Sequence, residues 1–187
     1  PSLYRAGNYA VEGDWSGASY LLAAGALGSR PVRVEGLRSD TMQGDRAIRV
    51  ILERMGARTE EGENSLTVYP SPLKGVEADM SDCPDLVPTV AVLAAFAEGE
   101  ILVRGVAHLR IKECDRIAAP AGELGKAGVP VEERPDGLMI RGNPELDLRG
   151  RALELLAHGD HRMAMSLSLL ECKGASVRLD NPAVVNK

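Results

Sequence analysis

Apolar residues fall into three runs of helical length, and an aspartate precedes each run. The runs are "WSGASYLLAAGALG" after Asp14, "LVPTVAVLAAFAEG" after Asp85 and "HRMAMSLSLLECKG" after Asp160. Each run ends at a glycine that follows its aspartate by 14 residues. An aspartate at a helix start accepts hydrogen bonds from unpaired backbone N–H groups, and a glycine commonly ends a helix. The spacing therefore predicts three helices of one repeat, each capped by its aspartate.

Short β-branched or alternating stretches surround these helices and predict strands. The predicted strands are "YAVE" at 9–12, "VRVEG" at 32–36, "RTEE" at 58–61, "SLTVY" at 65–69, "VEADM" at 76–80, "ILVRG" at 101–105, "PVEE" at 130–133, "GLMIR" at 137–141 and "SVRLD" at 176–180. A second helix is predicted over 43–55 and again over 113–127, ending at Gly56 and Gly128. The unit is thus βαβαββ, which indicates a mixed fold, α/β or α+β. Its copies span 9–69, 77–141 and 151–187, the third being incomplete.

Composition narrows the class of protein. The chain has 187 residues, 44% of them hydrophobic, which suffices for one domain over 1–187. A formal net charge of −5 argues against a nucleic-acid partner or an anionic membrane surface. No apolar run reaches the roughly 20 residues of a membrane-spanning helix, and no secretory signal opens the chain, so we expect a cytoplasmic protein.

Cysteine usage and the chain ends add two further expectations. The three cysteines, Cys83, Cys114 and Cys172, form no CxxC pair and no metal-ligand spacing, so we expect neither a disulfide nor a bound metal. The chain starts at Pro1 without an initiator methionine and ends just after an apolar run, so we expect a fragment.

A repeat architecture places equivalent helix starts on one surface. Lys112 precedes Lys187 by 75 residues, and Asp85 precedes Asp160 by the same distance. The residues predicted to surround one mouth are Asp85, Lys112, Glu113, Arg116, Asp160, His161, Arg162 and Lys187. Helix N-termini favour anions, and arginine can form two parallel hydrogen bonds to a carboxylate or phosphate. The pattern therefore indicates an anion-binding mouth.

Each motif also has a structural explanation, and spacing alone leaves the choice open. The segment "IKECDR" at 111–116 can also be a solvated first turn of a helix. Asp85 and Asp160 can be plain helix caps like Asp14. His161 can be a capping residue or a support behind the site. Cys83 and Cys114 can be packing residues or nucleophiles, although the acids beside Cys114 oppose a low thiol pKa.

Three strings read together favour a functional site: "RIKECDRI" at 110–117, "GDHRMAMS" at 159–166 and the terminal "NK" after "LDNP". With them the chain resembles the enolpyruvyl transferases, and within these the family of 5-enolpyruvylshikimate-3-phosphate synthases, or 3-phosphoshikimate 1-carboxyvinyltransferases. "VEGDWSGASYLLAAGAL" and "NSLTV" are similar to the same family. The resemblance covers essentially the whole chain but only the C-terminal lobe of such enzymes.

The resemblance implies a fold and a reaction. The fold has two lobes, each with βαβαββ units in a pseudo-threefold arrangement, and this chain corresponds to one of them. The reaction transfers the enolpyruvyl group of phosphoenolpyruvate to the 5-hydroxyl of shikimate 3-phosphate and releases phosphate, a step of aromatic amino acid biosynthesis. No cofactor or metal is implied. The partners implied are these two small molecules and the N-terminal lobe of the same enzyme, and we expect a monomer.

By the matching motifs, the resemblance also implies residue roles. Asp85 takes the hydroxyl proton, and Glu113 protonates the enol methylene. Arg116 and Arg162 hold the phosphoenolpyruvate carboxylate. Lys187 reaches its phosphate or shuttles a proton, and Lys112 contacts the shikimate ring hydroxyls. Asp160 and His161 support them from behind. His108 stands where some relatives have asparagine, so that ring contact is unassigned.

The 3-phosphate site belongs to the other lobe in this family, so the resemblance implies half of a site and an inactive fragment. Two alternatives remain open. One is the related transferase that acts on UDP-N-acetylglucosamine, although its C-terminal lobe is not expected to combine "KExxDR" with "DHRMAM". The other is a non-catalytic βαβαββ module that binds a small anion or a partner protein.

Overall fold

A computed structural model describes residues 6–186 and contains most of the predicted repeat. The first copy consists of α1 (Trp15–Leu27), β1 (Val32–Glu35), α2 (Ala47–Arg54), β2 (Thr59–Gly62) and β3 (Ser65–Val68). Its strands form an antiparallel sheet in the order β1-β3-β2. Leu66 of the central strand β3 is paired with Val34 of β1 on one side and with Glu61 of β2 on the other. Residues alternate between more and less buried along β1, as expected for a strand with one face on the core.

The second copy forms the larger sheet. It contains β5 (Glu77–Asp79), α3 (Val87–Ala95), β6 (Ala97–Arg104), α4 (Ala118–Lys126), β7 (Val131–Arg134) and β8 (Gly137–Gly142). The short strand β4 (Leu73–Lys74) connects the copies and pairs with β6, which also pairs with β5 in parallel and with β8 in antiparallel. The third copy has β9 (Ala152–Leu155), α5 (His161–Ser168) and β10 (Ser176–Leu179), and its two strands are parallel.

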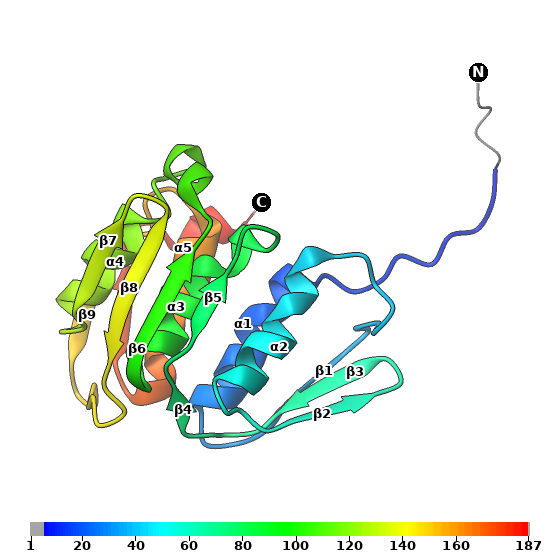
Figure 1. Ribbon diagram of the computed structural model, residues 1–187, viewed down its shortest axis with the longest axis horizontal. Helices are drawn as coiled ribbons and strands as arrows, with labels where there is room; N and C mark the ends of the chain where they lie inside the picture. The colour runs from blue at the N-terminus through cyan, green and yellow to red at the C-terminus, as the bar shows by residue number, and fades with distance from the viewer. Residues whose placement is uncertain (1–5, 187) are drawn as a thin grey trace.

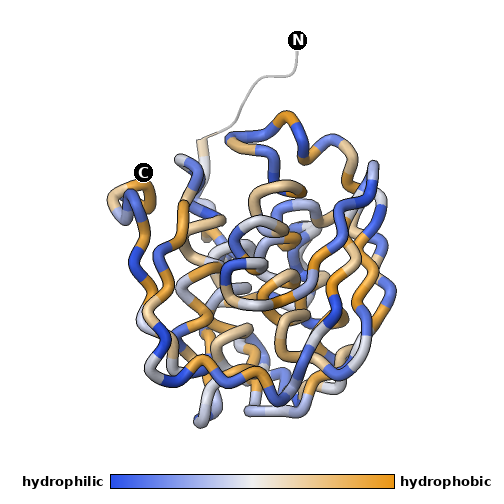
Figure 2. Tube along the Cα trace, turned by 90° about the vertical axis from the view of Figure 1, so that its left-hand side faces the viewer, coloured by the Kyte–Doolittle hydropathy of each residue, from blue (hydrophilic) through white to orange (hydrophobic). Residues whose placement is uncertain are grey.

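The first helix of each copy packs toward the centre. Helix α3 contacts both α1 and α5, and every one of its residues is buried. Figure 1 shows these helices lying behind and beside the sheets, which form the outer layers. Hydrophobic and hydrophilic residues alternate along the outer strands in Figure 2. The core therefore lies between the helices and the inner faces of the sheets.

Close packing explains one glycine of α1. A Cβ atom on Gly25 would lie 2.8 Å from the carbonyl oxygen of Val68 and 3.1 Å from the Cβ atom of Val32. Glycine thus allows α1 to approach β1 and β3 more closely than any other residue permits.

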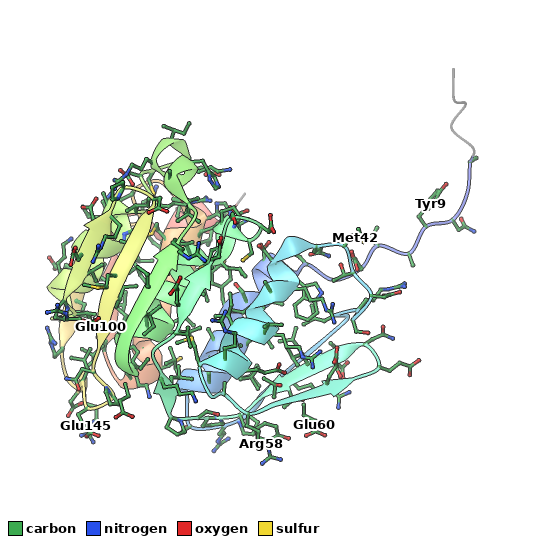
Figure 3. The ribbon with its side chains drawn as sticks, viewed as in Figure 1. Tyr9, Met42, Arg58, Glu60, Glu100 and Glu145 are labelled. Carbon is green, nitrogen blue, oxygen red and sulfur yellow. The ribbon has the colours of Figure 1, made fainter. Side chains whose placement is uncertain are left out.

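The predicted strand at 9–12 is wrong. Residues 9–12 have no regular secondary structure, and the side chains of Tyr9 and Val11 are 81% and 95% exposed. Figure 3 shows Tyr9 on the extended segment before α1, away from the rest of the chain. No described strand pairs with this segment, so alternation alone does not make it a strand.

Three predicted helices have different bounds. The run after Asp160 is α-helical only to Ser168 and continues as a 3-10 helix, Leu169–Lys173, up to Gly174. The run after Asp85 stops being helical at Ala95, and Gly99, predicted to end it, lies in β6 with a φ of 90°. The second helix of copy two begins at Ala118 rather than at 113. Asp115 accepts hydrogen bonds from the backbone N–H groups of Ile117 and Ala118 in the turn that precedes this helix. Within residues 6–186 no helix has the length and apolarity needed to cross a membrane.

Candidate functional site

The ends of neighbouring strands bring three segments together. Strands β5 and β6 are parallel, so the connections to α3 and α4 start at the same end of the sheet, toward the top of Figure 1. Asp85 lies in the 3-10 turn Pro84–Leu86 after β5, and Arg116 lies in the loop after the 3-10 turn Ala107–Ile111 that follows β6. Asp160 lies at the start of α5. Ligand sites of α/β proteins commonly form at this edge of a sheet.

Arg116 is the centre of the site. Its side chain is 1% exposed, and its Nε donates to Asp160 Oδ2 at 2.6 Å. Its Nη2 donates to Asp160 Oδ1 at 3.2 Å and to Glu113 Oε2 at 2.8 Å. Its Nη1 donates to Asp85 Oδ1 at 2.9 Å. The guanidinium is therefore surrounded by three carboxylates.

A second guanidinium shares one of these carboxylates. Arg162 Nη2 lies 2.8 Å from Asp85 Oδ2, and the Arg162 side chain is 16% exposed. We call Asp85, Glu113, Arg116, Asp160 and Arg162 the Arg116 cluster. The structure brings these five residues together near helix starts, as the repeat spacing predicts, while their role as a site stays a prediction.

The carboxylates of the cluster differ in burial, with one fully buried and two partly exposed. The Asp160 side chain has 0% exposure, whereas those of Asp85 and Glu113 are 33% and 42% exposed. Burial would raise the pKa of Asp160, but its bonds from Arg116 and from the backbone N–H of Arg162 outweigh burial and hold that pKa below its ordinary value. A hydrogen bond from its own backbone N–H lowers the pKa of Glu113, and Arg116 adds to this effect. Both groups are carboxylates at neutral pH.

The cap interpretation is correct for two aspartates and wrong for the third. Asp14 accepts from the N–H groups of Ser16 and Gly17, and Asp160 accepts from that of Arg162. Asp85 instead lies inside its 3-10 turn, and both of its oxygens bind arginines. Asp160 combines the two interpretations, because it caps α5 and also binds Arg116.

The remaining candidates surround the cluster less tightly. His161 Nδ1 lies 3.8 Å from Asp160 Oδ1. This histidine nitrogen is buried without a hydrogen-bond partner among the described residues. Lys112 is exposed at the end of the turn Ala107–Ile111 and makes no ion pair with the part of the chain that the structure describes. His108 lies exposed in the same turn. Lys187 lies outside the described residues.

The thiols are poor nucleophiles at neutral pH. Burial, together with the nearby Asp160 carboxylate to which its Sγ donates at 3.5 Å, raises the pKa of Cys114 to about 12. Burial likewise raises the pKa of Cys83 to about 11. The packing interpretation of both cysteines is therefore favoured. No group of three or more His, Cys, Asp or Glu side chains within residues 6–186 is placed to hold a metal ion.

Asp45 is a fourth acid, which the sequence pattern did not predict. Asp45 is 9% exposed and accepts a hydrogen bond from Ser16 Oγ. Burial raises the pKa of Asp45, and the negative charge of Asp85 raises it further. The hydrogen bond from Ser16 and the positive charge of Arg162 lower it, but burial outweighs them. The available signal was the dipeptide Asp45-Arg46, which repeats as Asp115-Arg116 at the equivalent helix start.

A buried phenol beside the cluster was also missed. Tyr20 of α1 is 7% exposed, and its hydroxyl finds no partner among residues 6–186. Burial raises its pKa, while the charge of Arg162 opposes this effect. Its place in an apolar helical run gave no sign of a polar neighbour.

Comparisons with known proteins identify the family of the chain. The family described as EPSP synthase (3-phosphoshikimate 1-carboxyvinyltransferase) matches residues 2–187. The chain belongs to the EPSP synthase family. The 3-phosphoshikimate 1-carboxyvinyltransferase of Methanococcus vannielii is 45% identical over 167 residues, which is 89% of this chain and 38% of that protein. The enzyme of that name from Syntrophobacter fumaroxidans is 44% identical over 188 residues, covering 100% of this chain and 44% of that protein.

Solved structures give the same result for the fold. An EPSP synthase from Acinetobacter baumannii has a TM-score of 0.81 at 26% identity, over 94% of this chain and 43% of that chain. The enolpyruvyl transferase NikO from Streptomyces tendae has a TM-score of 0.66 at 25% identity, over 94% of this chain and 40% of that chain. The fold class is thereby confirmed as one lobe of the enolpyruvyl transferase fold.

The family assignment has a limit set by length. The chain spans less than half of the length of each relative described above. The residue roles implied by the family motifs therefore remain predictions.

Proposed function

We propose that this chain is the C-terminal lobe of an enzyme that transfers the enolpyruvyl group of phosphoenolpyruvate to the 5-hydroxyl of shikimate 3-phosphate. The proposal rests on membership of the EPSP synthase family and on the Arg116 cluster. The complete site also needs an N-terminal lobe, since the chain corresponds to about 38 to 44% of its curated relatives. The expected setting is the cytoplasmic biosynthesis of aromatic amino acids.

The two-sided environment of Arg116 carries the proposal. Buried Asp160 holds the Nε edge of the guanidinium, so this edge keeps its orientation. Asp85 and Glu113 occupy the other N–H groups and are partly exposed, so they can yield them to an incoming carboxylate. Arg162 adjoins the same Asp85 and offers a second guanidinium. A small dicarboxylate-like or phosphorylated acid such as phosphoenolpyruvate fits two adjacent guanidinium groups.

Substrate binding would then change the pKa of Glu113 and leave Asp85 as a carboxylate. Once the substrate carboxylate takes the N–H groups of Arg116, Glu113 loses the positive neighbour that helps to lower its pKa. Its pKa rises, so the side chain becomes able to hold the proton that the methylene carbon needs. Asp85 stays beside Arg162 as a carboxylate able to accept the proton of the attacking hydroxyl. Binding thus prepares an acid and a base.

The proposed chemistry has two steps. In the addition step the 5-oxygen bonds to C2 of phosphoenolpyruvate, Asp85 accepts the hydroxyl proton and Glu113 protonates C3 to a methyl group. In the elimination step the C2–O bond to phosphate breaks, phosphate leaves with the proton that Asp85 had accepted, and a methyl proton returns to Glu113, which restores the methylene. Lys112 would contact the shikimate ring, and Lys187 would reach the phosphate. His161 would support Asp160, from which it lies 3.8 Å away.

The test is phosphate release from phosphoenolpyruvate plus shikimate 3-phosphate. We expect turnover by the full-length protein and none by the 187-residue chain alone, because the 3-phosphate site is assigned to the other lobe. UDP-N-acetylglucosamine serves as the control acceptor and should give no phosphate. Release with that acceptor alone, or no release by the full-length protein with either, would refute the proposal.

A further inference from the structure

Glu123 is a buried acid of α4 outside the Arg116 cluster. Its side chain is 3% exposed, and it lies in the helix that follows the loop containing Arg116. Its carboxylate binds three groups, of which only Lys126 belongs to its own helix. A carboxylate this deeply buried is uncommon unless its partners require it.

The other two partners belong to the segment that leads into α5. Glu123 Oε2 accepts a hydrogen bond from the backbone N–H of Leu156 at 2.9 Å, and Oε1 lies 3.0 Å from His158 Nε2. Burial would raise the pKa of Glu123, but Lys126, the Leu156 N–H and His158 together hold it below the ordinary value. The acid is therefore charged at neutral pH and fixes a loop as well as its own helix.

The segment 156–160 needs such a support. His158 has a φ of 54°, in the left-handed region that residues other than glycine rarely adopt, and Gly159 follows with a φ of 68°. Asp160 closes the turn by donating its N–H to the carbonyl oxygen of Ala157 at 2.9 Å. A loop in this conformation persists only when its surroundings fix it, and here Glu123 provides two of the contacts.

The turn ends at the residue that orients Arg116. Both oxygens of Asp160 are occupied, Oδ2 by Arg116 Nε and Oδ1 by Arg116 Nη2 and by the N–H of Arg162. Because Asp160 is fully buried, a displacement of its backbone lengthens these bonds without any compensating contact to water. The segment from Arg116 to Glu123 and the segment from Leu156 to Asp160 are thus joined at both ends.

We propose that Glu123 is a positioning residue of the site, which holds the turn 156–160 so that Asp160 keeps the guanidinium of Arg116 in its binding orientation. The consequence for phosphoenolpyruvate rests on the proposed function, in which Arg116 holds the substrate carboxylate. Glu123 itself touches no substrate in this proposal. It acts through Leu156, His158 and Asp160.

The test compares Glu123→Ala and Glu123→Gln in the full-length protein. We expect Glu123→Ala to raise the KM for phosphoenolpyruvate about tenfold or more while kcat changes less, because misplaced binding groups commonly cost that much. Glu123→Gln should recover most of the affinity, because its amide oxygen can still accept from the Leu156 N–H. Glu171→Ala is the matched control, since Glu171 also accepts a backbone N–H, that of Val177 at 3.2 Å, away from the cluster.

A second readout does not depend on the substrate. The Nε–H resonance of Arg116 reports its bond to Asp160, and we expect it to shift in Glu123→Ala but not in Glu171→Ala. If the full-length protein releases no phosphate, the proposed function fails while this resonance still tests the positioning role. Should Glu123→Ala not fold, His158→Asn replaces it, because asparagine tolerates the left-handed conformation yet loses the ring contact. An unchanged resonance together with an unchanged KM in the folded variant would overturn the inference, whatever the loss of thermal stability.

Discussion

Asp85 shows how a residue's partners decide between two interpretations of the same sequence position. Asp14 and Asp160 bind the first N–H groups of their helices, whereas Asp85 binds Arg116 and Arg162. The helix that follows Asp85 starts without a side-chain cap. A substitution at Asp85 therefore tests the site rather than helix capping.

We expect Asp85→Asn to lower kcat of the full-length protein about a hundredfold or more, because an amide cannot accept a proton at neutral pH. Its stability should fall by about 1 kcal/mol, since a charged hydrogen bond is lost at a partly solvated position. Initial rates of phosphate release and urea unfolding measure the two effects. Asp14→Asn is the control, because asparagine caps a helix about as well as aspartate, and it should keep near-parental turnover. Equal turnover in both variants would remove Asp85 from the proposed mechanism.

The cysteines give a second prediction for single residues. With pKa values of about 12 for Cys114 and about 11 for Cys83, almost no thiolate is present at pH 7.5. We expect iodoacetamide to modify exposed Cys172 first in the folded protein, and the other two only after unfolding in urea. Peptide mass spectrometry after timed quenching measures this order. Alkylation of Cys114 as fast as that of Cys172 in the folded protein would contradict it.

Among the secondary-structure elements, α1 owes its close contact with the first sheet to a glycine. Gly25→Ala should lower the free energy of unfolding by about 1–3 kcal/mol, because the added Cβ meets the Val68 carbonyl oxygen at 2.8 Å and a well-packed core resists expansion. Gly122→Ala in α4 is the matched control, since its added Cβ meets nothing within 4 Å beyond its chain neighbours and its own helix backbone. There alanine should stabilise the helix by about 0.5–1 kcal/mol. Urea unfolding measures both, and a stable Gly25→Ala variant would show that α1 can move.

Local signals predicted most of the elements. Caps such as Asp14, the glycine stop at Gly174 and the alternation in β3 and β8 all act within a few residues, so the sequence reveals them. The errors occur where distant pairing decides. Ala97 leaves the helical run to pair with Leu73, and residues 9–12 have no described strand to pair with.

The same distinction applies to the site. The repeat spacing and the motifs predicted that Asp85, Arg116, Asp160 and Arg162 lie together. They could not predict that three carboxylates share Arg116, because spacing gives the position of a side chain and not its partner. Asp45 and Glu123 were missed for a related reason, since each binds a residue distant in the chain.

For the whole molecule, shifted carboxyl pKa values make stability depend on pH. The pKa values of Asp160 and Glu123 lie below those of the same groups in the unfolded chain, 3.8 and 4.5. The stability they contribute is complete above these values and is lost as the pH falls toward their folded pKa values. Acid unfolding of the protein should therefore begin below about pH 4.5, and urea midpoints measured from pH 7.5 to pH 3 test this.

Asp45 should act with the opposite sign. Burial raises its pKa above the unfolded value of 3.8, so the folded chain binds more protons than the unfolded chain between the two values. Its charge therefore destabilises the fold above its folded pKa, and this penalty disappears as the pH falls below 3.8. We expect Asp45→Asn to be more stable than the parent at pH 7.5, with a difference that shrinks toward pH 3.5, in paired urea titrations. Ser16 Oγ can still donate to the amide oxygen, so the exchange isolates the charge. A variant less stable than the parent at pH 7.5 would mean that the positive charge of Arg162 outweighs the burial of Asp45.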